Sequence, residues 1–558
     1  MPNEKRDKYV IGIDFGTLSA RGILVNVQNG SILSTAVKEY PHGVMDASLP
    51  DGTALGSDWA LQHPQDYLDC IAEIFPKLMK EAGVSPEDII GVGSDFTTCS
   101  ILPTKKNGVP LCFLPQYQKT PHAYVKLWKH HAAQKQANEL NRIAKQRGEK
   151  FLSKYGGKIS SEWMIPKIWQ IIDEAPEIYE AADRIMECGD WIVFQLTGEE
   201  KRSSCQMGYK AIWQKRTGYP SDDFFRSLDP RLEHVVDEKL SRTAYPLGTR
   251  AGFITEDSAK WTGLIPGTPV AVSCGDAHAA VPGAGITQPN IMLMVIGTSG
   301  CDMMVSEKEY QIPGICGICE DGILPGFFGY EAGQSCMGDH FQWFVDRLVS
   351  AEYRQAAKEK NMSVYQYFDH LASQIRPGKS GLLALDWWNG NRSVLVNADL
   401  TGLLLGMTLE TKPEEIYKAL VEAVAYGKRK IIDTFESNGA KITELYATGG
   451  IAEKSPFVMQ TFADVIGKHI KVSAVDNATC MGAAIMGAVA AGIEKGGYAT
   501  IEDAASVMSG GVRAEYVPNA ENQKVYERLY HEYCTLHDYF GIQNDVMKRL
   551  KEIKSADT

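Results

Sequence analysis

Short apolar runs separated by turn residues open the chain. Residues 9–16 (YVIGIDFG) and 20–27 (ARGILVNV) have the composition of β-strands, and a third such run (SILSTAVKEY) follows Asn29–Gly30. An Asn-Gly pair favours a two-residue hairpin loop, because both positions tolerate positive φ. The pattern therefore predicts three strands joined by tight turns in an antiparallel meander.

Helical spacing replaces this pattern after Pro64. Apolar side chains then recur three and four positions apart, at Tyr67, Cys70, Ile71, Ile74, Phe75, Leu78 and Met79. Pro64 suits the first position of a helix and Gly83 suits its C-terminal cap, so we expect a helix between them, with Pro76 as a point of kinking. The run at 88–96 (DIIGVGSDF) predicts a buried strand that ends at a polar loop.

The second half of the chain repeats this order. Residues 291–300 (IMLMVIGTSG) predict a strand that runs into a Gly-Thr-Ser turn, followed by another short strand. Helical spacing from Pro413 to Phe435 precedes an apolar run at 442–450 (ITELYATGG), which again ends at glycines. Two similar lobes, each directing a Gly-Thr turn at one shared cleft, have the arrangement of the actin-like ATPases.

The repeat also sets the expected domain boundaries. We expect an α/β fold of two actin-like (ribonuclease H-like) lobes around a central cleft, with an N-terminal lobe at 8–284 and a C-terminal lobe at 290–558. Residues 115–180 have the pattern of a helical insertion in the first lobe. Residues 512–558 have the pattern of helical additions to the second.

Composition and charge narrow the possible functions. The chain has 558 residues, 44% of them hydrophobic and 23% charged, which is typical of a globular protein with more than one core. Its net charge of −12 gives no overall attraction to nucleic acid or to an anionic membrane. No apolar stretch of signal-peptide length precedes Asp14. The longest uncharged run, 478–493, is too short to span a bilayer and predicts a buried helix packed closely on a neighbour.

Cysteine usage points to a reducing compartment. Twelve scattered cysteines without a secretory signal indicate free thiols and a cytoplasmic protein. The one close pair, Cys316 and Cys319, lacks the second pair that a zinc ribbon needs. We therefore expect two small thiols in a strand or turn.

The turn after the first strand carries residues suited to phosphate binding. In DFGTLSARG (14–22), glycine permits a sharp turn, and small hydroxyl residues leave amides and hydroxyls free for phosphate oxygens. Asp14, at the strand end, could hold Mg²⁺ directly or through water, and Arg21 could reach a terminal phosphate. An ordinary hairpin turn with a polar edge is the alternative.

A second turn, IGTSG (296–300), favours the phosphate interpretation, because two such turns in two lobes can clamp one polyphosphate between them. Other nucleotide motifs are absent from the sequence. Ser373 replaces the first glycine of a phosphate-binding loop around Lys379, and GVGSDF (91–96) lacks the third glycine of a dinucleotide fingerprint. Gly449–Gly450 would let an adenine or ribose lie against the backbone, although a plain strand-to-helix loop would look the same.

One carboxylate stands among small residues in SCGDAHAAVPGAG (273–285). A solvated loop would carry more polar residues than surround Asp276, and a core strand would not carry an acid. The stretch therefore suits the close approach of a ligand. An aspartate that caps the Ala-rich helix after it is the alternative, and the two roles are compatible because a helix N-terminus favours the ionised form.

Five motifs in this order resemble the FGGY family of carbohydrate kinases, within the actin/hexokinase/Hsp70-like superfamily. The resemblance covers residues 8 to about 545, and it is carried by IGIDFGTLSARGILV, CGDAHAAVPGAG, VIGTSG, ATGGIAEKSPFVMQTFADVIG and ATCMGAAIMGAVAAG. Four further segments resemble the branch of the family that phosphorylates L-ribulose, namely 94–103, 121–140, 159–171 and 330–344. Residues 112–122 lack the Trp-x-Asp-x-Arg pattern that kinases of glycerol and xylulose carry near this point.

The resemblance implies a cytoplasmic enzyme that uses ATP and Mg²⁺ to phosphorylate L-ribulose at the C5 hydroxyl, a step of L-arabinose breakdown. Asp276 matches the general base of the family, and the match implies sugar contacts at Asp95, Phe96 and Thr97. The apolar-flanked charges Lys210 and Glu331 are further candidates for ketose hydroxyls, or they form a structural ion pair. For His278, packing in the core is the simpler interpretation.

The resemblance also implies the nucleotide contacts. They are Gly16, Thr17 and Ser19 on the first turn, Gly297, Thr298 and Ser299 on the second, and Gly449, Gly450 and Lys454 beside the adenosine, in addition to Asp14 and Arg21. Leu18 departs from the hydroxyl residue that some relatives carry, so the first turn would have one polar contact fewer.

Three alternatives stay open from the sequence. The first is a kinase for another ketopentose or polyol, such as D-ribulose, xylulose or ribitol, since a few hydrogen bonds decide sugar stereochemistry. The second is a nucleotide-switched binding or filament protein like actin or Hsp70, and the third is an inactive sugar sensor. Asp276 argues against both of these. We expect no nucleic-acid or membrane partner, and a homodimer is compatible with the sequence.

Overall fold

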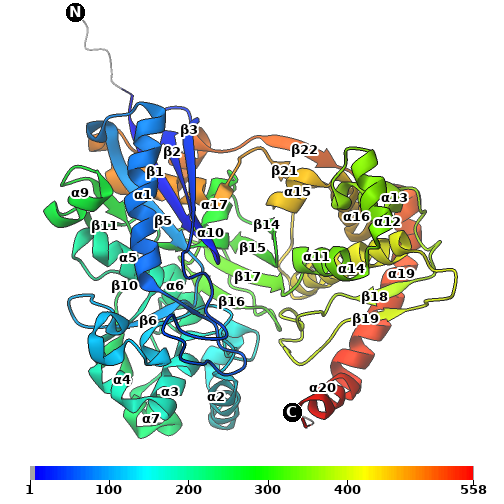
Figure 1. Ribbon diagram of the computed structural model, residues 1–558, viewed down its shortest axis with the longest axis horizontal. Coiled ribbons are helices and arrows are strands. Elements are labelled where there is room, and N and C mark those ends of the chain that lie inside the picture. Colours follow the sequence, from blue (N-terminus) through cyan, green and yellow to red (C-terminus); the bar gives the residue numbers. More distant parts are fainter. Residues whose placement is uncertain (1–6, 557–558) are drawn as a thin grey trace, which may run out of the picture.

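The computed structural model describes residues 7–556, which form two α/β lobes, each built on a large mixed sheet (Figure 1). Among these residues the first sheet has seven strands, with β13 (Cys274–Gly275) beside β5 and the others in the order β11 (Arg250–Phe253), β12 (Pro269–Ala271), β5 (Ile89–Phe96), β1 (Tyr9–Phe15), β2 (Ser19–Asn26) and β3 (Ile32–Glu39). Strands β1, β2 and β3 pair antiparallel, so the predicted meander is confirmed, and β5 runs parallel to β1.

The loop between β2 and β3 is longer than predicted. Gly30 alone takes a positive φ, of 70°, and its N–H donates to the Asn26 carbonyl at 2.9 Å. The Asn26 N–H donates to the Ser31 carbonyl, also at 2.9 Å. The prediction of a two-residue Asn-Gly hairpin was therefore wrong, because Asn29 lies within a wider turn that places only glycine in the left-handed region.

The second sheet, in the part of the chain described, also has seven strands, in the order β16 (Gly317–Glu320), β17 (Phe328–Gln334), β15 (Gly300–Ser306), β14 (Ile291–Ile296), β20 (Glu444–Thr448), β21 (Ile470–Ser473) and β22 (Val512–Tyr516). Strand β14 pairs antiparallel with β15 and parallel with β20, as β1 does with β2 and β5. The internal repeat read from the sequence is thus a repeat of strand pairing.

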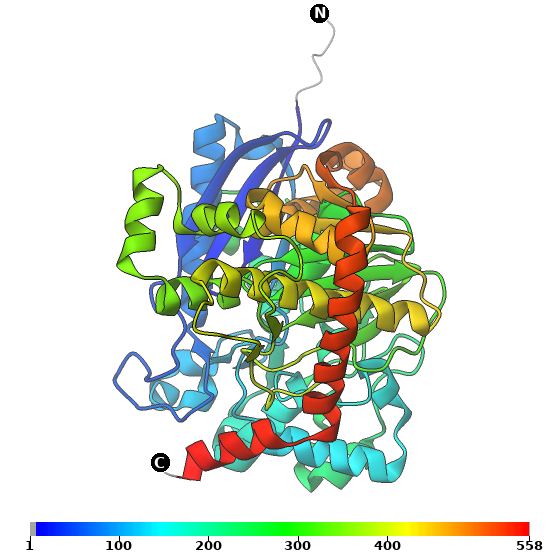
Figure 2. The same ribbon diagram turned by 90° about the vertical axis from the view of Figure 1, so that its right-hand side faces the viewer.

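Long helices begin and end close to their predicted positions. Helix α1 (Pro64–Ala82) is continuous through Pro76 and ends at Gly83, whose φ is 65°. Helix α14 (Pro413–Ser437) covers the second periodic segment. Residues 512–516 are a strand instead of a helix, and the helices of the C-terminal part are α19 (Ala520–Asp538) and α20 (Val546–Ala556). Figure 2 shows α19 running along the outside of the second lobe, with α20 turning away at its lower end.

Helix α17 (Ala478–Ala491) packs on the first sheet, although in the sequence it lies between β21 and β22 of the second sheet (Figure 1). The approach is very close, since a Cβ on Gly93 would lie 1.8 Å from the Ala483 carbonyl oxygen. Only glycine on the strand permits this contact. The prediction of a buried helix packed against a neighbour is confirmed.

The insertion in the first lobe combines helices with a small sheet. Its helices are α2 (Gln134–Arg147), α3 (Met164–Glu174) and α4 (Pro176–Ala181). Its strand β7 (Val125–Lys126) joins a four-stranded sheet with three strands from outside residues 115–180, namely β4 (Leu61–Gln62), β6 (Ile101–Thr104) and β8 (Arg184–Glu187). The remaining helices that bear on the site are α6 (Ser204–Lys210), α10 (Asp276–Gly283), α11 (Gly338–Leu348), α15 (Gly450–Lys454) and α16 (Pro456–Ile466).

All twelve cysteines are unbridged, and Cys319 lies in β16, as expected for thiols in a strand. Within residues 7–556, no helix has both the length and the apolar character that a membrane crossing requires.

Candidate active site

The first Gly-Thr turn connects β1 to β2 at the edge of the first lobe. The Gly16 N–H donates to the Ser19 carbonyl at 3.0 Å, which closes the turn. Two side chains from outside the turn hold Thr17: Gln62 Nε2 donates to its carbonyl at 2.7 Å, and Trp128 Nε1 donates to its hydroxyl at 3.1 Å. The turn is therefore held in shape by residues that the sequence motif does not include.

Two carboxylates lie side by side at the ends of β1 and β5. Parallel pairing places Asp14 directly opposite Asp95; Asp95 is fully buried and Asp14 is half-buried. The Thr479 hydroxyl donates to Asp14 Oδ2 at 3.0 Å, whereas neither carboxylate oxygen of Asp95 receives a hydrogen bond from a donor. Burial raises the pKa of both groups, and for Asp95 the nearby charges of Asp14 and Asp276 raise it further.

Asp276 is the first residue of α10, and it follows β13 on the same side of β5. Pairing of β13 with β5 sets Cys274 opposite Asp95 and Gly275 opposite Phe96, so Asp276 emerges beside the two carboxylates. Asp276 Oδ1 accepts the Ala277 N–H at 2.7 Å. Burial, with the charge of Asp14 added, raises the pKa of Asp276 to about 6.

Phe96 and Thr97, the other sugar contacts predicted at the end of β5, differ in the groups that they could present to a ligand. The ring of Phe96 is buried and stacks on Phe15 with 5.2 Å between centroids, so a sugar contact there would be made by main-chain atoms. The Thr97 hydroxyl lies 3.2 Å from the Ser100 hydroxyl, and the Thr97 N–H donates to the Phe15 carbonyl at 3.2 Å.

Lys210 and Glu331 are brought together from different lobes. Lys210, at the end of α6, places Nζ 2.8 Å from both carboxylate oxygens of Glu331 in β17. His278 Nε2 lies 3.5 Å from the same carboxylate, and its ring packs on Tyr209 with 4.3 Å between centroids. Although burial opposes it, the proximity of Cys205 and Glu331 raises the pKa of His278 to about 10.

The predicted pair of Lys210 and Glu331 is thus a cluster of three charged groups, with His278 as the third. Lys210 stabilises ionised Glu331 and holds the pKa of that carboxyl well below its usual range, despite burial. Lys210, His278 and Glu331, together with Asp276, form a cluster of charged side chains from α6, α10 and β17 where the two lobes meet.

The second Gly-Thr turn connects β14 to β15 and is closed by the Gly297 N–H, which donates to the Ser299 carbonyl at 3.1 Å. The Thr298 carbonyl accepts the Met337 N–H at 3.0 Å, which ties the turn to the start of α11. Gly449 lies against this turn: its φ is 102°, and a Cβ there would meet the Ile296 carbonyl oxygen at 2.5 Å. Gly450, by contrast, has open space at its Cβ position.

Two predicted contacts point elsewhere in the structure. Arg21 Nη1 donates to Asn477 Oδ1 at 2.8 Å, just before α17. Lys454, the last residue of α15, is exposed to solvent. Their proposed phosphate and adenosine contacts stay predictions.

Sequence reasoning missed three residues that shape the first turn and Asp14. Thr479 lies in the ATCMG motif, and its hydroxyl near the start of α17 was the one available signal. Trp128 belongs to the insertion and Gln62 to the short strand β4, and neither falls in a periodic pattern, so nothing local could have linked them to Thr17.

The residues at the strand ends suit a divalent cation. Asp14 and Asp95 present adjacent carboxylates, and both oxygens of Asp95 lack a donor. Hard cations such as Mg²⁺ take oxygen ligands of this kind, and a cation would remove the electrostatic cost of two adjacent negative groups.

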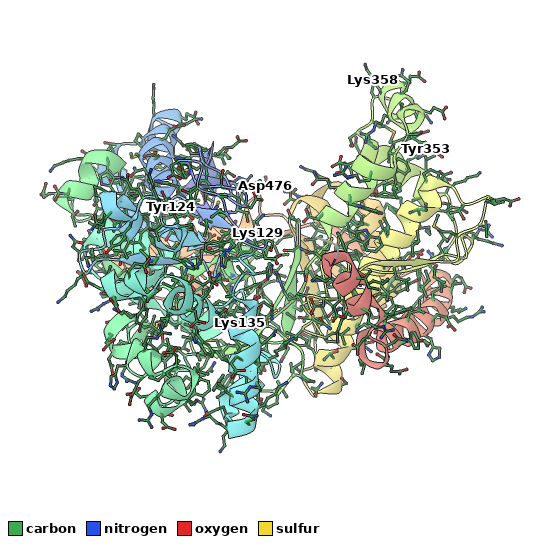
Figure 3. The ribbon with its side chains drawn as sticks, turned by 60° about the horizontal axis from the view of Figure 1, so that its bottom comes forward. Tyr124, Lys129, Lys135, Tyr353, Lys358 and Asp476 are labelled. Carbon is green, nitrogen blue, oxygen red and sulfur yellow. The ribbon has the colours of Figure 1, made fainter. Side chains whose placement is uncertain are left out.

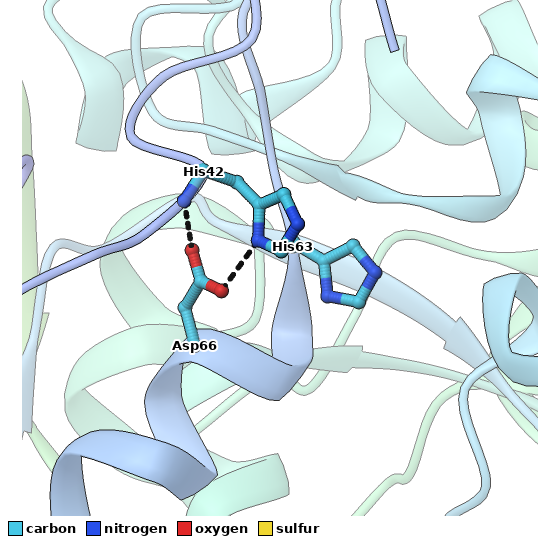
Figure 4. Close-up of side chains that lie close together, drawn as sticks. All are labelled: His42, His63 and Asp66. Atoms are coloured by element: carbon cyan, nitrogen blue, oxygen red, sulfur yellow. Dashed lines mark hydrogen bonds and ion pairs between the residues drawn. The ribbon is translucent and has the colours of Figure 1, made fainter. Parts of the chain in front are cut away.

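A second cluster, His42, His63 and Asp66, lies at the start of α1 (Figure 4). Asp66 accepts both the N–H of His42, at 3.0 Å, and its Nδ1, at 2.7 Å. The two imidazoles stack with 4.5 Å between centroids and planes 20° apart, so their in-plane lone pairs do not converge on one ion. The arrangement fastens the 40–43 segment to the helix.

Comparisons with known proteins identify the family of the chain. Residues 9–283 match the N-terminal domain of the FGGY family of carbohydrate kinases, and residues 292–491 match its C-terminal domain. The chain is 56% identical over 542 residues to the ribulokinase of Bacillus licheniformis, across 97% of this chain and 98% of that protein. It is 54% identical over 552 residues to the ribulokinase of Geobacillus thermodenitrificans, across 98% of each. The fold is similar to that of the xylulose kinase from Rhodospirillum rubrum, with a TM-score of 0.75 and 20% identity over 95% of this chain and 98% of that one.

Proposed function

The chain belongs to the FGGY family of carbohydrate kinases, and from that membership we propose that it transfers the γ-phosphate of ATP to the C5 hydroxyl of L-ribulose. The resemblance and the actin-like α/β fold expected from the sequence are confirmed. The ribulokinases named above support the choice of ribulose, because more than half of the residues are identical over nearly the full length.

The observation that carries the proposal is the position of Asp276. Its carboxylate lies at the start of α10, among small residues, close enough to Asp14, His278 and Glu331 for their charges to act on it. A base in this place can accept the proton of a sugar hydroxyl as that oxygen attacks phosphorus. Its raised pKa, about 6, suits a base that must release the proton again near neutral pH.

The remaining residues bind and orient the reactants. The turns at 16–19 and 297–299 would hold the phosphates from the two sides, and Gly449 with Gly450 would leave room for the adenosine. Lys210 and Glu331 would offer a donor and an acceptor to ketose hydroxyls. Asp14, with Asp95 beside it, would hold Mg²⁺, which neutralises phosphate charge when bound.

Closing of the lobes over both ligands would keep water from the phosphoryl group.

The described residues contain only unbridged cysteines, which supports the expected cytoplasmic location. L-Arabinose breakdown is the pathway in which phosphorylation of L-ribulose would serve.

The test is ADP release from MgATP with a panel of sugars. L-Ribulose, D-ribulose, both xyluloses, ribitol, L-arabinose and glycerol are each compared with a no-sugar control. Highest turnover on L-ribulose supports the proposal, and strong preference for another polyol keeps the kinase mechanism but replaces the substrate. ADP release that ignores every sugar overturns the proposal.

A further inference from the structure

One arginine of the second lobe reaches the first lobe beside the first phosphate turn. Arg392 lies in the loop between β18 (Leu383–Leu385) and β19 (Leu403–Leu405), at the start of a tight segment that the Asn391 and Asn397 backbones close with hydrogen bonds of 2.9 and 2.8 Å. Its Nη2 lies 3.6 Å from Glu162 Oε1, and both side chains are largely buried, 19% and 18% exposed. Its guanidinium carbon lies 5.6 Å from the centroid of the Trp128 ring.

Trp128 connects this arginine to the phosphate turn. The indole N–H donates to the Thr17 hydroxyl, so one face of the ring meets Arg392 while the ring edge holds the turn. The next residue, Lys129, lies on the side of the first lobe that faces the second (Figure 3). Lys129 is also close enough to Asp339, at the start of α11, to oppose the increase in pKa that burial causes there.

Glu162 connects the arginine to the sugar side of the cleft. Besides Arg392, it faces His131 Nε2 at 3.8 Å, and the charge of Lys210 is near enough to help lower its pKa. The following residue, Trp163, places its ring 5.5 Å from Lys210 Nζ. Glu162 and Trp163 therefore contact Arg392 and Lys210, respectively, from adjacent positions in the chain.

The loop that carries Arg392 is held from both lobes. Lys158 Nζ, in the first lobe, donates to the Val396 carbonyl at 3.0 Å. In the second lobe, the Gly333 N–H donates to the Ser393 hydroxyl at 3.2 Å, two residues beyond Glu331 in β17. Because the backbone of the loop is fixed at both ends, the long and flexible Arg392 side chain starts from a defined position.

We propose that Arg392 is a positioning residue of the kinase: with Glu162 and Trp128 it forms an interlobe latch that holds the first phosphate turn against the second lobe. The inference rests on the proposed function. An arginine suits this role because its planar cation can pair with a carboxylate while it lies on an aromatic face. Release of the latch would misalign Thr17 and admit water to the phosphoryl group.

The test compares Arg392→Gln and Arg392→Lys with Arg216→Gln as the matched control. Arg216 also forms an ion pair between the lobes, with Glu320 at 2.6 Å, but its side chain is 68% exposed and it lies away from Trp128. We expect Arg392→Gln to lower kcat/KM for the sugar about tenfold and to raise the ratio of ADP to sugar phosphate formed. Arg392→Lys should fall between Arg392→Gln and the wild type, since a lysine keeps the charge but not the planar contact. Arg216→Gln should match the wild type.

Charge reversal tests the pair itself. Glu162→Arg and Arg392→Glu should each impair transfer, and the double variant should recover a large part of kcat/KM, because an ion pair of inverted polarity is restored. A double variant no better than the worse single one overturns the latch. So does an Arg392→Gln variant that behaves like Arg216→Gln.

A measurement without sugar separates this inference from the proposed function. Small-angle X-ray scattering with MgADP reads the separation of the lobes whether or not ribulose is the substrate. A larger radius of gyration for Arg392→Gln than for wild type supports the latch, and an unchanged radius overturns it. Absence of sugar-stimulated ADP release in the wild type would overturn the proposed function alone.

Discussion

Lys210 and Glu331, which are 121 positions apart in the chain, form a bidentate ion pair in which Lys210 Nζ lies 2.8 Å from each carboxylate oxygen. One residue ends a helix of the first lobe, and the other lies in the second sheet. The side chains are 6% and 8% exposed. The pair therefore joins the lobes at the floor of the cleft, in the place where a sugar is expected.

Replacing one member of this pair should destabilise the protein strongly. Lys210→Met leaves the Glu331 carboxylate buried beside His278 without its main counter-charge, which typically costs about 3–5 kcal/mol of unfolding free energy. The double variant Lys210→Met/Glu331→Leu should recover most of that stability, since the buried carboxylate is removed together with its partner and His278 can lose its proton. Urea unfolding of the two variants and the wild type measures both effects.

The same double variant separates binding from structure. If the pair also contacts the sugar, the restabilised enzyme should still have a KM for the sugar raised about tenfold or more, with the KM for MgATP little changed. Wild-type kinetics in a stable double variant would show that the pair serves only to join the lobes.

Asp276→Asn should abolish most transfer while leaving binding intact. Asparagine keeps the shape and can still accept the Ala277 N–H through its carbonyl oxygen, but it cannot accept a proton from the sugar. Loss of a general base lowers kcat by about 10²–10⁴-fold. Calorimetric titration with sugar and with MgADP serves as the control, and near-normal turnover in a variant that binds both would remove Asp276 from the catalytic role.

Activity should fall at mildly acidic pH. Asp276 must be ionised to act as a base, and its pKa is raised to about 6, chiefly by burial and by the charge of Asp14. Because protonation inactivates the base, kcat/KM for the sugar should rise with pH through about 6 and level off above it. An unperturbed aspartate, with a pKa of about 3.9, would give a flat profile over about pH 5 to 8. Re-assay at neutral pH after acid exposure excludes irreversible inactivation, and circular dichroism at the acid pH shows whether the enzyme is still folded there.

Local pattern predicted much of the fold, because the periods of strands and helices are properties of consecutive residues. Helices α1 and α14 and the strands around both turns are of this kind. The strand β22 was missed, since its residues are mostly exposed and only pairing with β21 defines it. A segment at a sheet edge carries little signal of its own.

The sequence predicted the site residues that lie in a local motif. It did not predict contacts that arise only when distant segments pack together. The sequence singles out Asp14 and Asp276, yet the adjacency of Asp14 and Asp95 follows from the parallel pairing of two strands. The contact of Arg392 with Glu162 joins two loops that no periodicity relates. Such contacts depend on how the lobes dock, which the pattern of one chain does not encode.

Gly449 and Gly450 separate two effects of adding a side chain, namely backbone strain and loss of space for the nucleotide. Gly449 has φ 102° and ψ 165°, a region nearly closed to other residues, and a Cβ there would clash with the Ile296 carbonyl oxygen at 2.5 Å. Gly449→Ala should therefore lose about 1–3 kcal/mol of stability, besides weakening ATP binding. Gly450→Ala meets no protein atom within 4 Å, so its stability should stay near that of the wild type.

If the adenosine lies against Gly450, however, the added methyl group occupies space that the nucleotide needs. Gly450→Ala should then raise the KM for MgATP several-fold while the KM for the sugar and the unfolding midpoint stay constant. Thermal unfolding with and without MgADP reads both properties in one experiment, because a ligand that binds the folded protein raises the midpoint more the more tightly it binds. A Gly450→Ala enzyme that MgADP stabilises as well as it does the wild type would place the adenosine elsewhere. The Gly449→Ala result would then report strain at the second turn alone.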